Sequence, residues 1–194
     1  MFSIRQADMN DFYFVVEIDL LDEGIGIENP YLEASFEEQS ELLGRLAQFL
    51  DPSLNTGETE IYTCPKYALV CEDTETKEKI GLIMFLFRDM NDPTFQTFGV
   101  YDKFDRGVFP RDGKVCEIFQ LWVAPGERRK GIATELMKEA EEITRDNDIR
   151  MIYGHTESGN DHVVELCNKL GYEVIRKGML NDEVVRVSQI KHLG

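Results

Sequence analysis

The sequence has little positive charge and no long apolar run. Lys and Arg together number 21 against 37 Asp and Glu, so the formal net charge is −16. A chain this acidic repels a phosphate backbone, which excludes most modes of nucleic-acid binding. It instead favours cationic small molecules or basic peptides as partners, unless the acidity serves only solubility. No apolar run approaches the length needed to cross a bilayer, so we expect no membrane partner.

Cysteine and histidine are also scarce. The four cysteines include no CxxC pair and the three histidines show no ligand spacing, so the sequence predicts neither a metal site nor a redox dithiol. Three of the cysteines lie in apolar runs, as small core residues do. The charged N-terminus does not resemble a signal peptide, and we therefore expect the reducing cytoplasm as the location. A length of 194 residues fits one domain, 1–194.

The central feature is a strand, a turn and a helix within residues 115–143. Residues 115–123 are rich in β-branched and aromatic side chains, which favours a strand. Pro125 and Gly126 break it. Apolar residues then recur at the spacing of one helical face, at Ile132, Leu136, Met137, Ala140 and Ile143.

Three cations and two small residues lie where this helix begins, namely Arg128, Arg129, Lys130, Gly131 and Ala133. The first turn of a helix leaves N–H groups unpaired, and the helix dipole places partial positive charge behind them. Because Gly131 has no side chain, a ligand can approach the backbone there. The combination predicts a phosphate-binding site.

The hexapeptide from Arg128 to Ala133 resembles the signature of the GCN5-related N-acetyltransferases, abbreviated GNAT. That signature is Arg or Gln, two residues, Gly, one residue, then Gly or Ala, directly after a strand. In the family, backbone amides of this loop hold the pyrophosphate of acetyl-coenzyme A (acetyl-CoA). The resemblance therefore implies acetyl-CoA as cosubstrate, held by Arg128, Arg129, Lys130, Gly131, Ile132, Ala133 and Thr134.

The order of expected elements matches the family over nearly the whole chain. Helices are expected after Asp8, after a Ser35–Glu38 capping box, after Gly131 and from Asn160 to a Gly171 cap. The expected strands are 1–5, 66–71, 80–87, 115–123, 149–155, 172–176 and 184–190, with Gly178 and residues 181–182 in the last turn. Strand 80–87 is apolar on both faces and should be central.

The resemblance implies an α/β (α+β) GNAT fold, a mixed and mostly antiparallel sheet of six or seven strands with about four helices. In that family two neighbouring parallel strands splay apart beside the phosphate-binding loop, which is Arg128–Ala133 here and is called the phosphate loop below. The pantetheine arm of acetyl-CoA enters between these strands. The equivalent strands here would end at Val123 and His155. Leu121 and Val123 would offer backbone groups to the arm.

Two loops are candidates for contact with the second substrate. The connection 88–114 alternates aromatic residues with aspartates, and both groups attract ammonium ions. Its aromatic residues could equally anchor the loop to the core. Loop 22–31 contains Gly24, Gly26 and Pro30, and both loops would flank the mouth of the family's cleft.

Glu117 is the candidate general base. It lies eleven residues before Arg128, the offset at which some lysine acetyltransferases of the family carry their glutamate. A partly buried carboxylate would have a raised pKa and could accept a proton, in some members through water. Glu117 could instead be structural. Gln120, of opposite parity on the strand, is an uncharged alternative.

Asn160 and Cys167 occupy two further positions of the family pattern. Asn160 matches the asparagine that opens the last helix, and the resemblance implies that it contacts the cofactor. Seven residues later the family often has a tyrosine that protonates the leaving thiolate, but this chain has Cys167. A thiol could take that role, or it could be a small core residue.

These observations predict an N-acetyltransferase that moves an acetyl group from acetyl-CoA to a primary amine of a small molecule or peptide, by direct transfer in a ternary complex. The acceptor is expected to be cationic. Because Cys167 departs from the pattern, a non-catalytic coenzyme A-binding or regulatory domain is the alternative. Whether the protein forms a homodimer is left open.

Overall fold

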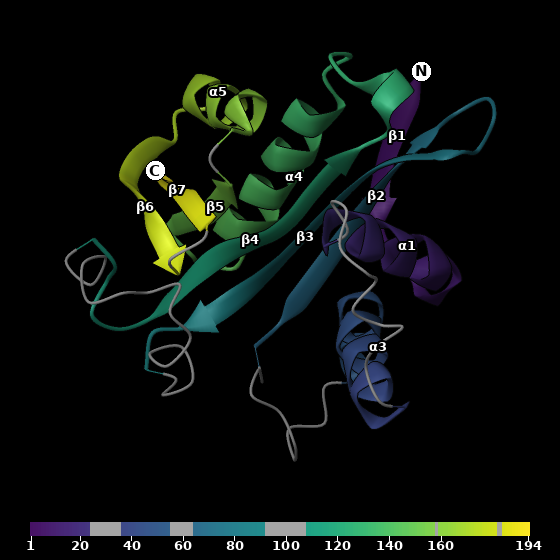
Figure 1. Cartoon of the computed structure of the whole chain (residues 1–194), viewed down its shortest axis with the longest axis horizontal. Helices are drawn as coiled ribbons and strands as arrows, with labels where there is room; N and C mark the ends of the chain where they lie inside the picture. Colours follow the sequence, from purple (N-terminus) through teal and green to yellow (C-terminus); the bar gives the residue numbers. More distant parts are fainter. Residues whose placement is uncertain (24–35, 55–63, 92–107, 158, 182–183) are drawn as a thin grey trace. The chain divides into compact units, whose positions relative to one another are not determined.

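The computed structural model describes residues 1–23, 36–54, 64–91, 108–157, 159–181 and 184–194 (Figure 1). Its strands form one seven-stranded sheet in the order β1-β2-β3-β4-β5-β7-β6. Four α-helices, α1, α3, α4 and α5, are present in the described ranges. The predicted fold class is confirmed.

Contacts divide the chain into two compact units. The first unit comprises residues 1–84 and 120–133, and the second comprises residues 85–119 and 134–194. Strands β3 and β4 and helix α4 each contribute residues to both. The units are described separately below, and a single domain 1–194 stays a prediction.

The strands of the first unit begin with β1 (Phe2–Gln6), which pairs antiparallel with β2 (Lys66–Asp73). A turn leads from β2 to β3 (Lys79–Asp89). Every residue of β3 from Ile80 to Phe87 is buried, so the apolar run correctly predicted a central strand.

The helices of the first unit are α1 (Phe12–Glu23) and α3 (Phe36–Leu50), which contact each other, and α3 also contacts β2. Asp8 caps a 3₁₀ turn, η1 (Met9–Asp11), that precedes α1, and not α1 itself. Helix α3 ends two residues before Pro52, which cannot continue a helix, and a second 3₁₀ turn, η2 (Pro52–Leu54), follows. Ser35 of the expected capping box lies outside the described residues.

A buried ionic network in the first unit was not predicted. The carboxylate of Asp11 is fully buried and accepts hydrogen bonds from Arg5 at 2.7 and 3.0 Å. Lys79 lies 2.7 Å from the same carboxylate, and Arg5 also donates to Glu72 at 2.6 Å. These contacts join β1, η1, β2 and β3 across long sequence separations.

The second unit contains most of β4 (Lys114–Val123) and α4 (Ile132–Asp146), together with four further elements. These are β5 (Met151–Glu157), α5 (Asp161–Lys169), β6 (Glu173–Asn181) and β7 (Val184–His192). Strand β7 pairs antiparallel with β5 on one side and with β6 on the other (Figure 1). The α5 helix ends at Gly171 with a φ of +85°, as its C-terminal glycine predicted.

The structure corrects the expected turn between the last two strands. Gly178 does not lie in that turn, because it is part of β6 and pairs with Arg186 of β7. The register of β6 shifts at two places, between Val174 and Arg176 and between Met179 and Asn181. These shifts mark bulges or irregularities in a strand at the edge of the sheet.

Two clusters stabilise the second unit. An apolar cluster joins the sheet to the end of connection 88–114, and its members are Phe109, Val115, Met151, Tyr153 and Ile190. On α4, Glu141 is buried and accepts hydrogen bonds from Lys191 of β7 at 2.7 and 2.8 Å. That polar contact interrupts the predicted apolar face of α4.

Candidate active site

The turn between β4 and α4 has the backbone of an anion-binding loop. It runs through a 3₁₀ turn, η4 (Pro125–Glu127), and then places Arg129 at φ +64° and Gly131 at φ +89°. A side chain built at Gly131 would meet no atom within 4 Å, so its exposed backbone faces open space. The left-handed φ and the open approach both explain why glycine is present there.

Backbone N–H groups at the end of this loop make no hydrogen bonds to other described backbone groups and are available to a ligand. The N–H groups of Lys130 and Gly131 donate to none of the described backbone carbonyls. The first turn of α4 adds N–H groups that have no intrahelical partner. Ile132 is buried, so it can present only its N–H to a ligand, whereas Ala133 and Thr134 are half-buried.

The three cations differ in their contacts. Lys130 donates to both carboxylate oxygens of Glu127 at 2.8 Å. The Nε of Arg128 donates to the carbonyl of Val123, at the end of β4, at 3.1 Å. Arg129 makes no ion pair with any residue that the structure describes. Because Arg128 donates to it, the carbonyl of Val123 already has one hydrogen-bond donor. The side chains of Leu121 and Val123 are half-buried.

In the second unit, Glu117 lies on β4 and pairs with Arg88 of β3. The Nε of Arg88 donates to the Glu117 carboxylate, and the two side chains are only 11% and 4% exposed. Burial raises the pKa of the Glu117 carboxyl, while the neighbouring Arg88 acts in the opposite direction. Sequence reasoning missed Arg88, because nothing in the chain marks a partner 29 residues away.

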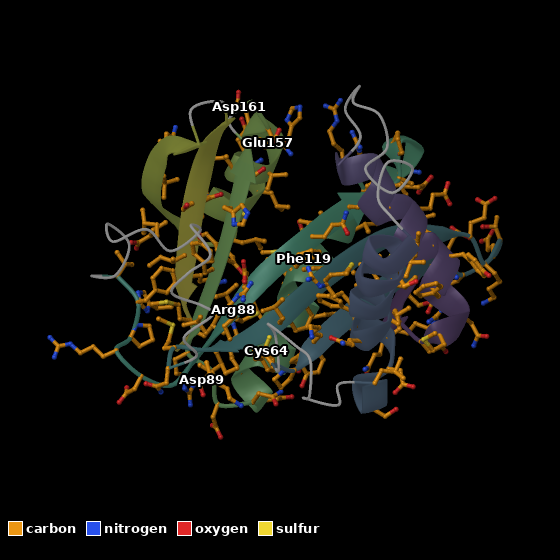
Figure 2. All side chains as sticks on the ribbon, turned by 60° about the horizontal axis from the view of Figure 1, so that its bottom comes forward. Cys64, Arg88, Asp89, Phe119, Glu157 and Asp161 are labelled. Atoms are coloured by element: carbon orange, nitrogen blue, oxygen red, sulfur yellow. The ribbon has the colours of Figure 1, made fainter. Side chains whose placement is uncertain are left out.

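The pairing of β4 with β5 places further polar and aromatic groups near Glu117. This pairing is parallel and joins Cys116–Ile118 to Ile152–Gly154, with Glu117 opposite Tyr153. His155 lies two residues further along β5, on the same side as Tyr153, with the two ring centroids 6.1 Å apart. Phe119, labelled with Arg88 in Figure 2, is 49% exposed.

His155 is a titratable group that the sequence analysis set aside. Its signal in the sequence was its place at the end of the strand that the resemblance set beside the strand of Glu117, but the histidines show no ligand spacing that would indicate a role. The parallel pairing itself agrees with what the resemblance implied for these two strands.

Gln120 belongs to the first unit and is buried. Its side-chain N–H donates to the carbonyl of Ile18 on α1 at 3.4 Å. Its carboxamide oxygen has no hydrogen-bond donor among the described residues. An amide in this position cannot accept a proton at neutral pH, so it is a weaker candidate than Glu117 for acid–base chemistry.

The last helix places Asn160 and Cys167 in different surroundings. Asn160 is the exposed N-cap residue of α5, and its side chain makes no capping hydrogen bond. Cys167 is buried on α5, where burial, with a smaller contribution from Glu141, raises the pKa of its thiol to about 11. Glu157 and Asp161 lie near Asn160 at the end of β5 and the start of α5 (Figure 2).

The expected acceptor loops are only partly described. Residues 24–31 and 92–107 lie outside the described residues. Phe109, at the end of the second loop, is buried and packs edge-to-face on Tyr153 with centroids 5.1 Å apart. This residue therefore anchors the loop to the core, which is one of the two alternatives left by the sequence.

A cavity of about 620 Å³ in the first unit does not coincide with the phosphate loop. It is lined mainly by the turn between β2 and β3 and includes Gly126 and Glu127, but none of the three cations. Within the described ranges there is no cluster of His, Cys, Asp and Glu that could hold a metal ion. Nor does any described helix have the length and apolar character needed to span a membrane.

Comparison with known proteins places this geometry in a family. A model of the acetyltransferase (GNAT) family matches residues 29–172, which is most of the chain. No curated protein sequence matches it. Among solved structures, mosquito arylalkylamine N-acetyltransferase like 5b is similar with a TM-score of 0.67 and 18% identity over 100% of both chains.

Two further structures share the fold. Arabidopsis thaliana NAA60 in complex with acetyl-CoA has a TM-score of 0.64 at 15% identity, covering 99% of this chain and 98% of that one. The spermidine/spermine N-acetyltransferase SpeG from Vibrio cholerae has a TM-score of 0.57 at 16% identity, covering 99% and 95%. The family match, the sheet and the glycine loop before α4 agree, and the chain belongs to the GNAT acetyltransferase family.

Proposed function

We propose that this protein is an N-acetyltransferase that transfers the acetyl group of acetyl-CoA directly to a primary amine of a small molecule or peptide. The observation that carries the proposal is the loop from Arg128 to Ala133, with its left-handed Gly131 and open approach. Outward N–H groups, a helix start and cationic side chains are what a diphosphate needs. The family match supports acetyl transfer as the reaction.

The residues of the loop would divide the work of holding acetyl-CoA. The N–H groups of Lys130, Gly131 and Ile132 would donate to the pyrophosphate, and Arg129 has no competing ion pair in the described structure. Thr134 and Asn160 are accessible enough to add contacts. Arg128 would act by holding the end of β4 through the carbonyl of Val123.

The acceptor amine must lose a proton before or during its attack on the thioester. Glu117 is the proposed base, because burial raises the pKa of its carboxyl toward neutrality, where a general base works best. Its ion pair with Arg88 opposes this role by stabilising the carboxylate. His155, whose imidazole can accept a proton, is the second candidate.

The acceptor proposed is a cation, on the basis of the net charge of −16. Cytoplasmic location is proposed with it, from the small number of cysteines and the absence of a CxxC pair in the sequence.

The test compares one substitution at two glycines of the same conformation. Asn tolerates left-handed φ angles, so Gly131→Asn adds a side chain in the loop with limited strain. Gly113→Asn is the matched control, since Gly113 has a φ of +88° and equally open space. Calorimetry should show weaker acetyl-CoA binding for Gly131→Asn only, with similar melting temperatures for both.

Turnover is tested with the unmodified protein. Release of free coenzyme A should depend on an added amine, over a panel of polyamines, arylalkylamines, amino acids and peptides. Binding of acetyl-CoA without release for any amine would favour a non-catalytic coenzyme A-binding domain. Absence of acetyl-CoA binding would refute the proposed function.

A further inference from the structure

One carboxylate lies directly before the three cations of the phosphate loop, Arg128–Ala133. Glu127 is the last residue of η4, and its backbone N–H donates to the carbonyl of Ala124 at 2.8 Å. That hydrogen bond closes the turn and holds the backbone of Glu127 next to the three cations, while its side chain is free to rotate. An acidic side chain is unfavourable in a site for a diphosphate, because like charges repel.

Glu127 makes direct contact with one of the cations. Both of its oxygens lie 2.8 Å from the ammonium of Lys130, and the pair spans three residues of the loop. A diphosphate that reached Lys130 would have to compete with this carboxylate for the same donors. The side chains are 32% and 55% exposed, so the contact is loose enough to be exchanged for a ligand.

We propose that Glu127 is an internal counter-anion of the phosphate loop, which competes with the diphosphate of the cosubstrate for Lys130 and thereby limits how tightly the cosubstrate is held. The inference rests on the proposed function, because it assumes that acetyl-CoA binds at this loop. Its consequence is faster release of coenzyme A after transfer. Glu127 thus sets the affinity of the site and takes no part in the chemistry.

The chain offers a matched control for this pair. Glu135 and Lys138 on α4 have the same three-residue spacing and the same 2.8 Å contact, and their side chains are also exposed. They lie within the helix and not in the loop that precedes it. Glu135 lies in the first turn of α4, one residue after Thr134, so Glu135→Gln removes the same charge close to the site without freeing any of the three loop cations.

The test measures binding of acetyl-CoA, coenzyme A and S-acetylpantetheine by calorimetry at low and physiological salt. Glu127→Gln should bind both diphosphate ligands about two- to fivefold more tightly, most clearly at low salt, and stopped-flow should show slower release. Glu135→Gln should tighten binding clearly less than Glu127→Gln, because it frees none of the three loop cations. S-acetylpantetheine, which lacks the diphosphate, should bind both variants equally.

Three results would overturn the inference. The first is an unchanged affinity of Glu127→Gln for acetyl-CoA. The second is weaker acetyl-CoA binding by this variant, which would make Glu127 a support of the loop. The third is that this variant binds S-acetylpantetheine more tightly by the same factor as acetyl-CoA. Failure of the unmodified protein to bind acetyl-CoA would refute the proposed function instead, and the two failures are therefore distinguishable.

Discussion

At the scale of single residues, Glu117 can be tested by removing its charge. Glu117→Gln should lower turnover by ~10²–10⁴-fold if the carboxylate is the base, with acetyl-CoA affinity nearly unchanged. The base must be deprotonated, and burial raises the pKa of Glu117. The rate should therefore fall as pH drops through that raised pKa in the unmodified protein, and this dependence should be absent from the variant.

The ion pair with Arg88 makes a stability control necessary for this variant. Removing one partner of a buried pair typically costs about 3–5 kcal/mol, so melting temperature must be measured alongside rate. Glu157→Gln, at an exposed position on β5, provides the matched charge control. A full rate in Glu117→Gln at every pH would assign Glu117 a structural role and leave His155 or water to accept the proton.

Cys167 is a second residue whose role can be decided. Burial raises the pKa of its thiol to about 11, whereas an ordinary thiol has a pKa near 8.5. Proton transfer from Cys167 to a leaving thiolate would thus be uphill, and Cys167→Ala should keep turnover within about twofold. A loss of tenfold or more at unchanged melting temperature would instead establish Cys167 as the general acid.

The sequence identified residues whose signal is local and missed those whose signal is not. Gly131 and Gly171 were predictable because a single backbone position demands glycine at each, and both have left-handed φ angles. Arg88 was missed because its pairing with Glu117 appears only in the folded chain. His155 was named only as the end of a strand, because no residue pattern around it indicates a role. The phosphate loop could be predicted from six consecutive residues, whereas the surroundings of Glu117 could be described only once the pairing of β3, β4 and β5 was known.

At the scale of elements, the sequence predicted single strands well but missed contacts between elements. Strand β3 was predictable as central because its burial is continuous, and apolar character on both faces reports that directly. Gly178 was misassigned because glycine is common in turns and also occurs in irregular strands. The buried Asp11 and Glu141 were missed because each has a partner far away in the sequence, Lys79 for Asp11 and Lys191 for Glu141.

The Asp11 network should make an element-level contribution to stability. Asp11→Asn would leave Arg5 and Lys79 without their shared buried carboxylate, but both cations are partly exposed and Arg5 keeps Glu72, so we expect the free energy of unfolding to fall by about 1–3 kcal/mol. Exposed Asp146→Asn, at the end of α4, is the control and should change it little. Denaturant unfolding at neutral pH measures both.

The same network predicts the sign of a pH effect. Although burial by itself would raise the pKa of Asp11, hydrogen bonds from Arg5, Lys79 and the backbone hold it well below its usual range. Its stabilisation is therefore complete above about pH 4, the ordinary aspartate pKa, and is lost as pH falls below that value. The free energy of unfolding, measured from pH 6 to pH 2, should fall less steeply for Asp11→Asn than for the unmodified protein. An equally steep fall in both would contradict this assignment.

At the scale of the whole molecule, the net charge of −16 should govern encounter with the acceptor. Long-range attraction raises the association rate of a cation, and it is screened over a Debye length of roughly 8 Å at physiological salt. We expect kcat/KM for a cationic acceptor to fall as salt rises, while a neutral amine shows little change. An anionic acceptor preferred over cations, or a cation rate indifferent to salt, would assign the acidity to solubility alone.

The irregular register of β6 has a consequence for how copies of this protein meet. Strand β6 ends the sheet, and its outer backbone groups could in principle template another strand. Two shifts within nine residues interrupt the even spacing of those groups, so an incoming strand could match only short stretches of it. We therefore expect edge-to-edge pairing of two copies through β6 to be disfavoured.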